Sequence, residues 1–221
     1  MSVALVACAH GTADPAGQKA IEQVRARIAE LLPQVDVIGA SVDVEEPSLA
    51  DVVATLSAAG RRCVVVPLLL SAGYHVFHDI AEVVAASGGL AAAAAALGPD
   101  DALVDLLDRR LTEAGVASSA PVVLAAAGSS DARAVRDVHR VAADLAGLRG
   151  ASVLPAFLSA AEPRVERVVT DGMPVATYLL APGYFYDELM RRTVGAAAVT
   201  APLAPDDAVA RLAVRRFTEA L

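Results

Sequence analysis

Short apolar runs alternate along the chain with segments whose apolar residues recur every three or four positions. In the N-terminal part the apolar runs cover residues 3–8, 36–42, 63–70 and 91–96, which are lengths typical of strands. Strands that alternate with helical segments are typical of βαβ units, which build parallel sheets covered by helices. The pattern therefore predicts an α/β fold with a doubly wound parallel sheet.

Two of the intervening segments carry signs of helices. The first is preceded by Asp14, a preferred N-cap residue, and by Pro15, which suits the first helical position. We assign a similar helix-opening role to Glu46 and Pro47 in the second segment. Each segment gathers its apolar residues on one helical face: Ile21, Val24, Ile28 and Leu31 in the first, and Leu49, Val52, Val53 and Leu56 in the second.

The same series of elements is written twice. "VALVACAHGTAD" returns as "PVVLAAAGSSD", "EPSLADVV" as "EPRVERVV", "PLLLSAGYH" as "TYLLAPGYF" and "LGPDDALVDLLDRRLTEA" as "LAPDDAVARLAVRRFTEA". Four matches in the same order indicate a duplication of one fold unit. We expect two similar tandem halves, residues 1–117 and 118–221, each a doubly wound parallel sheet, with a cleft between them.

Composition narrows the class of protein. The net charge of −8 and the absence of Trp argue against a general nucleic-acid surface. No apolar run reaches the roughly 18 to 20 residues of a membrane span, and the N-terminus "MSVALVACAHGTADP" lacks a basic leader, so we expect a cytoplasmic protein without membrane partners. Cys8 and Cys63 lie inside predicted strands and are interpreted as small core residues.

Differences between the two halves point to chemistry. His10 faces Ala127 in the second half, Asp43 faces Ser159, and His75 faces Phe185. The three polar residues follow the first three strands of the first half, at the sheet edge where open α/β sheets bind ligands. If the first strand lies between the second and third, strand spacing of roughly 4.8 Å brings all three within about 10 Å. Two imidazoles and a carboxylate are suitable ligands for one divalent ion.

Three other polar residues, His78, Asp79 and His139, have less definite roles. His78 could be a fourth ligand, a substrate contact or a solvated helix residue. Asp79 is interpreted as a helix cap in preference to a metal ligand. His139 lies off the apolar face of its predicted helix, so we expect it to be exposed to solvent.

These motifs resemble the class II tetrapyrrole chelatases of the CbiX and SirB type, which insert a divalent metal into sirohydrochlorin. "HGTADP" is similar to the HGS opening of that family, "VDVEEPSL" to its acidic stretch before EPS, and "GYHVFHDI" to its G-x-H-V-x-x-D-I loop. The resemblance implies that His10 and His75 handle the metal and act in catalysis, with Asp43 where many relatives have glutamate. Ala13 stands where relatives often have arginine.

The resemblance also implies a substrate and a way to bind it. The substrate would be a flat, carboxylated tetrapyrrole, with a divalent metal, cobalt first and iron or nickel next, as co-substrate and with no organic cofactor. The ring would contact Tyr74, Phe77, Tyr184 and Phe185. Its carboxylates would meet backbone N–H groups near Gly11, Thr12, Gly128 and Ser129, while Arg191 and Arg192 could assist or form a solvated helix face. Two fused halves are compatible with a monomer.

Two other classes of protein stay open at this point. The "AHGT" stretch could imitate the RHG motif of histidine phosphatases, although Ala9 stands where that chemistry needs an arginine. The same site could also bind a tetrapyrrole or deliver a metal without catalysing insertion. Binding without accelerated insertion would distinguish the second class.

Overall fold

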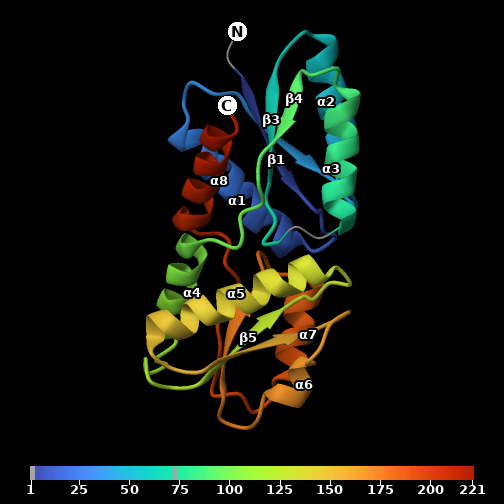
Figure 1. Ribbon diagram of the computed structural model, residues 1–221. Coiled ribbons are helices and arrows are strands. Elements are labelled where there is room, and N and C mark those ends of the chain that lie inside the picture. The colour runs from blue at the N-terminus through green and yellow to red at the C-terminus, as the bar shows by residue number, and fades with distance from the viewer. Residues whose placement is uncertain (1–2, 72–73) are drawn as a thin grey trace. The chain divides into compact units, whose positions relative to one another are not determined.

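The computed structural model describes residues 3–71 and 74–221, and the side chains of residues 74–77 lie outside this description. The chain forms two compact units, Met1–Leu97 with Ala204–Leu221, and Gly98–Leu203. Each unit contains one sheet of four parallel strands with helices packed on it (Figure 1). The α/β fold with two similar halves, expected from the sequence, is confirmed.

The sheet of the first unit has the strand order β2-β1-β3-β4. Its strands are β1 (Ala4–Ala9), β2 (Val37–Ser41), β3 (Cys63–Pro67) and β4 (Ala91–Ala93). Its helices are α1 (Pro15–Leu31), α2 (Leu49–Ala58), α3 (Tyr74–Ala86) and α8 (Asp207–Glu219). The central strand β1 is buried along its whole length and pairs in parallel with β2 on one side and β3 on the other, which is the order on which the predicted site depends.

The sheet of the second unit repeats this order as β6-β5-β7-β8. Its strands are β5 (Val122–Ala126), β6 (Val153–Phe157), β7 (Pro174–Tyr178) and β8 (Ala198–Val199). Its helices are α4 (Asp101–Glu113), α5 (Ala132–Arg149), α6 (Val165–Val168) and α7 (Tyr184–Arg192). The repeated topology means that equivalent residues of the two halves occupy equivalent places in their own sheets.

The compact units differ from the two sequence repeats in their last helices. Helix α8, from the second repeat, packs on α1 and β3 of the first unit, whereas α4, from the first repeat, packs on α5 and β7 of the second (Figure 1). Asp207 of α8 pairs with Arg27 of α1 at 2.5 Å, and Asp108 of α4 pairs with the buried Arg149 of α5 at 2.5 Å. The boundary expected near residue 117 therefore marks the sequence duplication, while the compact units exchange their final helices.

The start of α1 agrees with the sequence prediction, but that of α2 does not. The Asp14 carboxylate accepts a hydrogen bond from the Gly17 N–H at 2.9 Å and caps α1, with proline in its first turn. Pro47, by contrast, precedes the N-cap of α2 and is not in the helix. The cap is Ser48, whose hydroxyl accepts from the Asp51 N–H at 3.1 Å.

Cys8 and Cys63 are buried and free, as expected for small core residues. Burial raises the pKa of the Cys8 thiol to about 12, so this thiol stays protonated at neutral pH. Within the parts of the chain that the structure describes, no helix has both the length and the apolar character needed to cross a membrane.

Candidate functional site

His10 and Asp43 are neighbours at the carboxyl edge of the first sheet. The ladder between β1 and β2 continues beyond the strands, because the Val42 N–H donates to the Ala9 carbonyl at 3.0 Å and the Asp43 N–H donates to the His10 carbonyl at 2.9 Å. Both side chains are exposed. The backbone positions that carry an imidazole and a carboxylate are thus neighbours at the edge where such sheets bind ligands.

A very close contact between two loops holds this pair in place. A Cβ added to Gly11 would lie 1.8 Å from the Asp43 carbonyl oxygen, so only glycine allows the loop after β1 to approach the loop after β2 this closely. The second half repeats the contact, with the Cβ position of Gly128 at 1.9 Å from the Ser159 carbonyl oxygen. The close approach is therefore a property of the fold, whereas the imidazole and carboxylate belong to the first half alone.

His75 lies in the first turn of α3, which follows β3 on the other side of β1. The Leu68 N–H donates to the Cys8 carbonyl at 2.7 Å, so the chain leaves β3 beside the end of β1. Residues 72–73 and the side chains of Tyr74, His75 and Phe77 lie outside the described part of the chain. The roles assigned to these three side chains stay predictions.

Glu45 is a site-edge residue that the sequence reasoning missed. Its carboxylate accepts a hydrogen bond at 2.7 Å from the N–H of Thr12, in the loop that begins with His10. The Thr12 hydroxyl accepts from the Asp14 N–H at 3.1 Å, and the Thr12 carbonyl accepts from the Gln18 amide at 2.9 Å. The Thr12 N–H is thus engaged within the protein, and the substrate contact expected near Thr12 stays a prediction.

We predict that Glu45→Ala loosens the loop after His10 and lowers the free energy of unfolding by about 1 to 2 kcal/mol, because the Thr12 N–H loses a charged acceptor. Glu45→Gln keeps an acceptor oxygen and should recover most of that loss. Chemical denaturation of the two variants and the parent protein measures the difference. Equal stability of the alanine and glutamine variants would contradict a role for this hydrogen bond.

A second group of metal-ligating side chains follows on α3. His78, Asp79 and Glu82 are exposed and offer ligand atoms within 4.8 Å of one another, with the His78 Nδ1 at 3.5 Å from a Glu82 oxygen. Asp79 lies in the second turn of α3, so its interpretation as a helix cap was wrong. The exposed position expected for His139 is confirmed.

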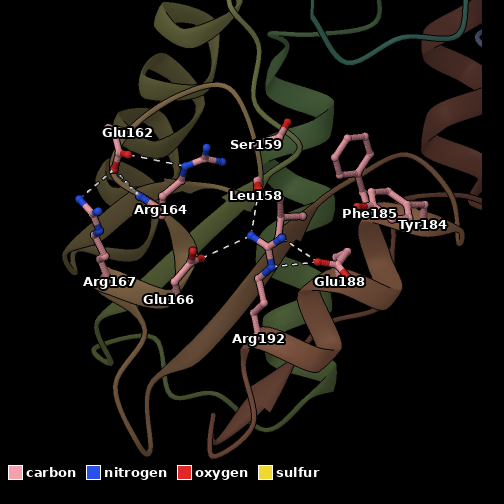
Figure 2. A pocket seen from close by; sticks show the side chains of 10 residues that line it. All are labelled: Leu158, Ser159, Glu162, Arg164, Glu166, Arg167, Tyr184, Phe185, Glu188 and Arg192. Carbon is pink, nitrogen blue, oxygen red and sulfur yellow. Dashed lines mark hydrogen bonds and ion pairs between the residues drawn. The ribbon is translucent and has the colours of Figure 1, made fainter.

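The second half has a pocket of about 500 Å³ at the carboxyl edge of its own sheet. It lies between the loop after β6, helix α6 and helix α7 (Figure 2). Its lining combines three arginines, three glutamates and two aromatic rings with Leu158 and Ser159: Arg164, Arg167, Arg192, Glu162, Glu166, Glu188, Tyr184 and Phe185. Tyr184 and Phe185, expected to contact a ring, therefore line a pocket.

The base of this pocket is a tight ion-pair network. Arg192 donates to Glu188 at 2.7 Å and to the Leu158 carbonyl at 3.0 Å, and pairs with Glu166 at 3.5 Å. Hydrogen bonds from Arg191 and Arg192 lower the pKa of Glu188, which stays charged. Arg191 and Arg192 are thus both paired with Glu188, and Arg191 is exposed on its helix face whereas Arg192 is mostly covered.

The remaining predicted contacts of the second half are loop residues. Gly128 and Ser129 follow β5, and the Ser129 hydroxyl accepts from the Asp131 N–H at 3.0 Å. This turn is the counterpart of the turn at Thr12 and Asp14. Ala161 stands in the position of Glu45, so the second half lacks the carboxylate that engages the Thr12 N–H.

The protein is thus a duplicated α/β protein in which one half carries imidazole and carboxylate side chains at its sheet edge and the other a pocket lined by arginines, glutamates and aromatic rings. The family model described as CbiX matches residues 4–114 and 121–220, which is nearly the whole chain. The chain belongs to the CbiX family. No relative is found among the curated protein sequences.

Solved structures share this architecture. SirB from Bacillus subtilis with Fe3+ superposes with a TM-score of 0.82 at 24% identity, covering 99% of this chain and 95% of that one. The sirohydrochlorin chelatase SirB from Bacillus subtilis subspecies spizizenii in complex with cobalt gives 0.81 at 22% identity, with coverage of 99% and 95%. DR2241 from Deinococcus radiodurans, a multi-domain protein with structural similarity to chelatases, gives 0.72 at 18% identity and covers 98% and 55%. These likenesses establish the fold.

Proposed function

We propose that the chain is a sirohydrochlorin chelatase that inserts a divalent metal ion into the tetrapyrrole, for cobalamin or siroheme synthesis. The observation that carries the proposal is the adjacency of His10 and Asp43 at the carboxyl edge of the first sheet. Membership of the CbiX family and the fold shared with SirB, a sirohydrochlorin chelatase, support it. The two free, buried cysteines suit the reducing cytoplasm, where we place the reaction.

The chemistry requires a group that handles both metal and protons. Insertion forms bonds from the metal to the ring nitrogens and releases the pyrrole protons of the free ring. A neutral imidazole can bind the incoming ion or accept such a proton near neutral pH. We assign these tasks to His10 and His75, and we assign to Asp43 the balancing of charge and the orientation of the hydrated ion.

The donor set does not select one metal. Imidazole and carboxylate bind Fe²⁺, Co²⁺ and Ni²⁺ with affinity that rises in that order, so supply decides which ion is used. We infer cobalt as the first candidate and iron as the second. The SirB structures contain Fe3+ in one case and cobalt in the other, which supports these two candidates.

The proposed function is tested by following the absorbance of sirohydrochlorin with each of Co²⁺, Fe²⁺ and Ni²⁺. We expect the protein to accelerate insertion of at least one ion well beyond the uncatalysed rate under matched conditions. If the protein binds the ring or the ion and leaves every rate unchanged, the alternative of a non-catalytic binding or delivery protein replaces this proposal.

A further inference from the structure

The pocket of the second half occupies the place that the metal-ligating residues occupy in the first. The two loops match bond for bond: the Ser41 N–H donates to the Pro47 carbonyl at 3.1 Å, and the Phe157 N–H donates to the Pro163 carbonyl at 2.9 Å. Isolated bridges join Ser41 to Ser48 and Phe157 to Arg164. Residues that match in the two repeats therefore occupy equivalent backbone positions at the two sheet edges.

The comparison shows an exchange of charge. Ser48 and Asp51 of the first half become Arg164 and Arg167 in the second, while Asp43 becomes Ser159. The first edge carries carboxylates and imidazoles, which favour a cation. The second edge lacks Asp43 and the imidazoles and has gained the guanidinium groups of Arg164 and Arg167, which favour a carboxylate, beside the glutamates that line the same pocket.

Arg164 is present at a cost to local structure. At the same position the Ser48 hydroxyl caps α2, whereas Arg164 makes no side-chain cap hydrogen bond at the start of α6. Loss of a serine cap destabilises a helix by about 1 kcal/mol. A residue that breaks a local rule without local compensation is a candidate for function.

The charges around Arg164 leave room for an anion. Arg164 and Arg167 share one carboxylate, Glu162, at 3.6 and 3.7 Å. Two guanidinium groups thus face one carboxylate through long, partly exposed pairs, which are weak. Arg192 differs, because Glu188 and Glu166 hold it in the base of the pocket.

Aromatic side chains lie across the pocket from Arg164 (Figure 2). Tyr184 is 70% exposed and Phe185 38% exposed, and their rings meet edge to face with centroids 5.4 Å apart. Exposed rings beside guanidinium groups suit a ligand that has an apolar face and an anionic edge.

We propose that this pocket recognises a carboxylate carried by a flat conjugated ring. Arg164 and Arg167 bind the carboxylate, and Tyr184 and Phe185 pack against the adjoining edge of the ring. The identity of the ligand rests on the proposed function, since sirohydrochlorin is such a ring.

The proposal is tested by fluorescence titration of the full-length protein with uroporphyrin, a metal-free ring that carries carboxylates around its edge. Arg164→Ser and Arg167→Gln should each weaken binding about tenfold, the effect of losing one charge-assisted contact. Arg140→Gln, which removes a paired, exposed arginine from α5, should leave binding unchanged. Arg164→Ser introduces the residue that caps α2, so thermal unfolding should show no loss of stability.

The results distinguish a failure of the pocket proposal from a failure of the proposed chelatase function. Unchanged binding in both pocket variants, or an equal loss in Arg140→Gln, would overturn the pocket proposal and leave metal insertion to be judged by its own assay. Citrate, which has carboxylates but no ring, tests whether the pocket contacts a ring. If citrate binds as tightly as uroporphyrin and with the same dependence on Arg164, the pocket recognises free carboxylates, and the proposed ring contact with Tyr184 and Phe185 is wrong. Arginine-dependent uroporphyrin binding without any metal insertion would support the pocket and count against the proposed function.

Discussion

Replacing His10 with alanine should reduce metal insertion by at least about a hundredfold, the lower range for loss of a group that transfers protons or binds metal. His10 is exposed, so we expect the free energy of unfolding to change by less than about 0.5 kcal/mol. Absorbance-monitored insertion and chemical denaturation measure the two effects on the same preparation.

His139→Ala is the matched control for His10→Ala. His139 is also exposed, but it lies on α5 of the second unit. The control should insert metal at the rate of the parent protein. Comparable rates for His10→Ala and His139→Ala would remove His10 from the mechanism.

Gly11→Ala should produce the largest loss of stability among the variants considered. The backbone of Gly11 has φ of 101°, and an added Cβ would lie 1.8 Å from the Asp43 carbonyl oxygen. Left-handed strain of about 1 to 2 kcal/mol and overpacking of about 1 to 3 kcal/mol should together lower the free energy of unfolding by about 2 to 5 kcal/mol. Because the clash separates the loops that carry His10 and Asp43, metal binding should weaken as well.

Alanine variants of Gly60 and Gly128 are controls that separate backbone strain, overpacking and the loss of metal binding. Gly60 has φ of 65° with open space around its Cβ position, so Gly60→Ala should show only the backbone strain. Gly128→Ala should cost about as much stability as Gly11→Ala but spare metal binding by the folded protein. Calorimetric unfolding and Co²⁺ titration measure both quantities, and a Gly11→Ala variant no less stable than Gly60→Ala would contradict the close loop contact.

The alternation of strands and helices predicted the parallel sheets from local patterns. The adjacency of His10 and Asp43 depended on the first strand lying between the second and third, an order that the structure has. The sequence did not predict the exchange of α4 and α8. Helices α4 and α8 have matching sequences and bury equivalent faces. These sequences do not indicate which of the two sheets each helix covers. The answer lies in tertiary packing, since α8 packs on α1 and β3 while α4 packs on α5 and β7.

Two further differences between the halves are visible in the sequence but did not enter the prediction of the site. Glu45 faces Ala161, and Ser48 faces Arg164. The first difference indicates the carboxylate that engages the Thr12 N–H, and the second indicates the missing side-chain cap at the start of α6. The roles of Glu45 and Arg164 depend on the backbone groups that lie near them in the fold. Residue spacing does not reveal hydrogen bonds between segments that are distant in the sequence.

The central claim is that the first half, at its sheet edge, holds the metal ion that is to be inserted. The most direct test is anomalous scattering at the cobalt edge from crystals of the protein soaked in Co²⁺. We predict one dominant ion bound by the imidazoles of His10 and His75, with the Asp43 carboxylate beside it. An ion found only at His78, Asp79 and Glu82, or none near His10, would contradict the account.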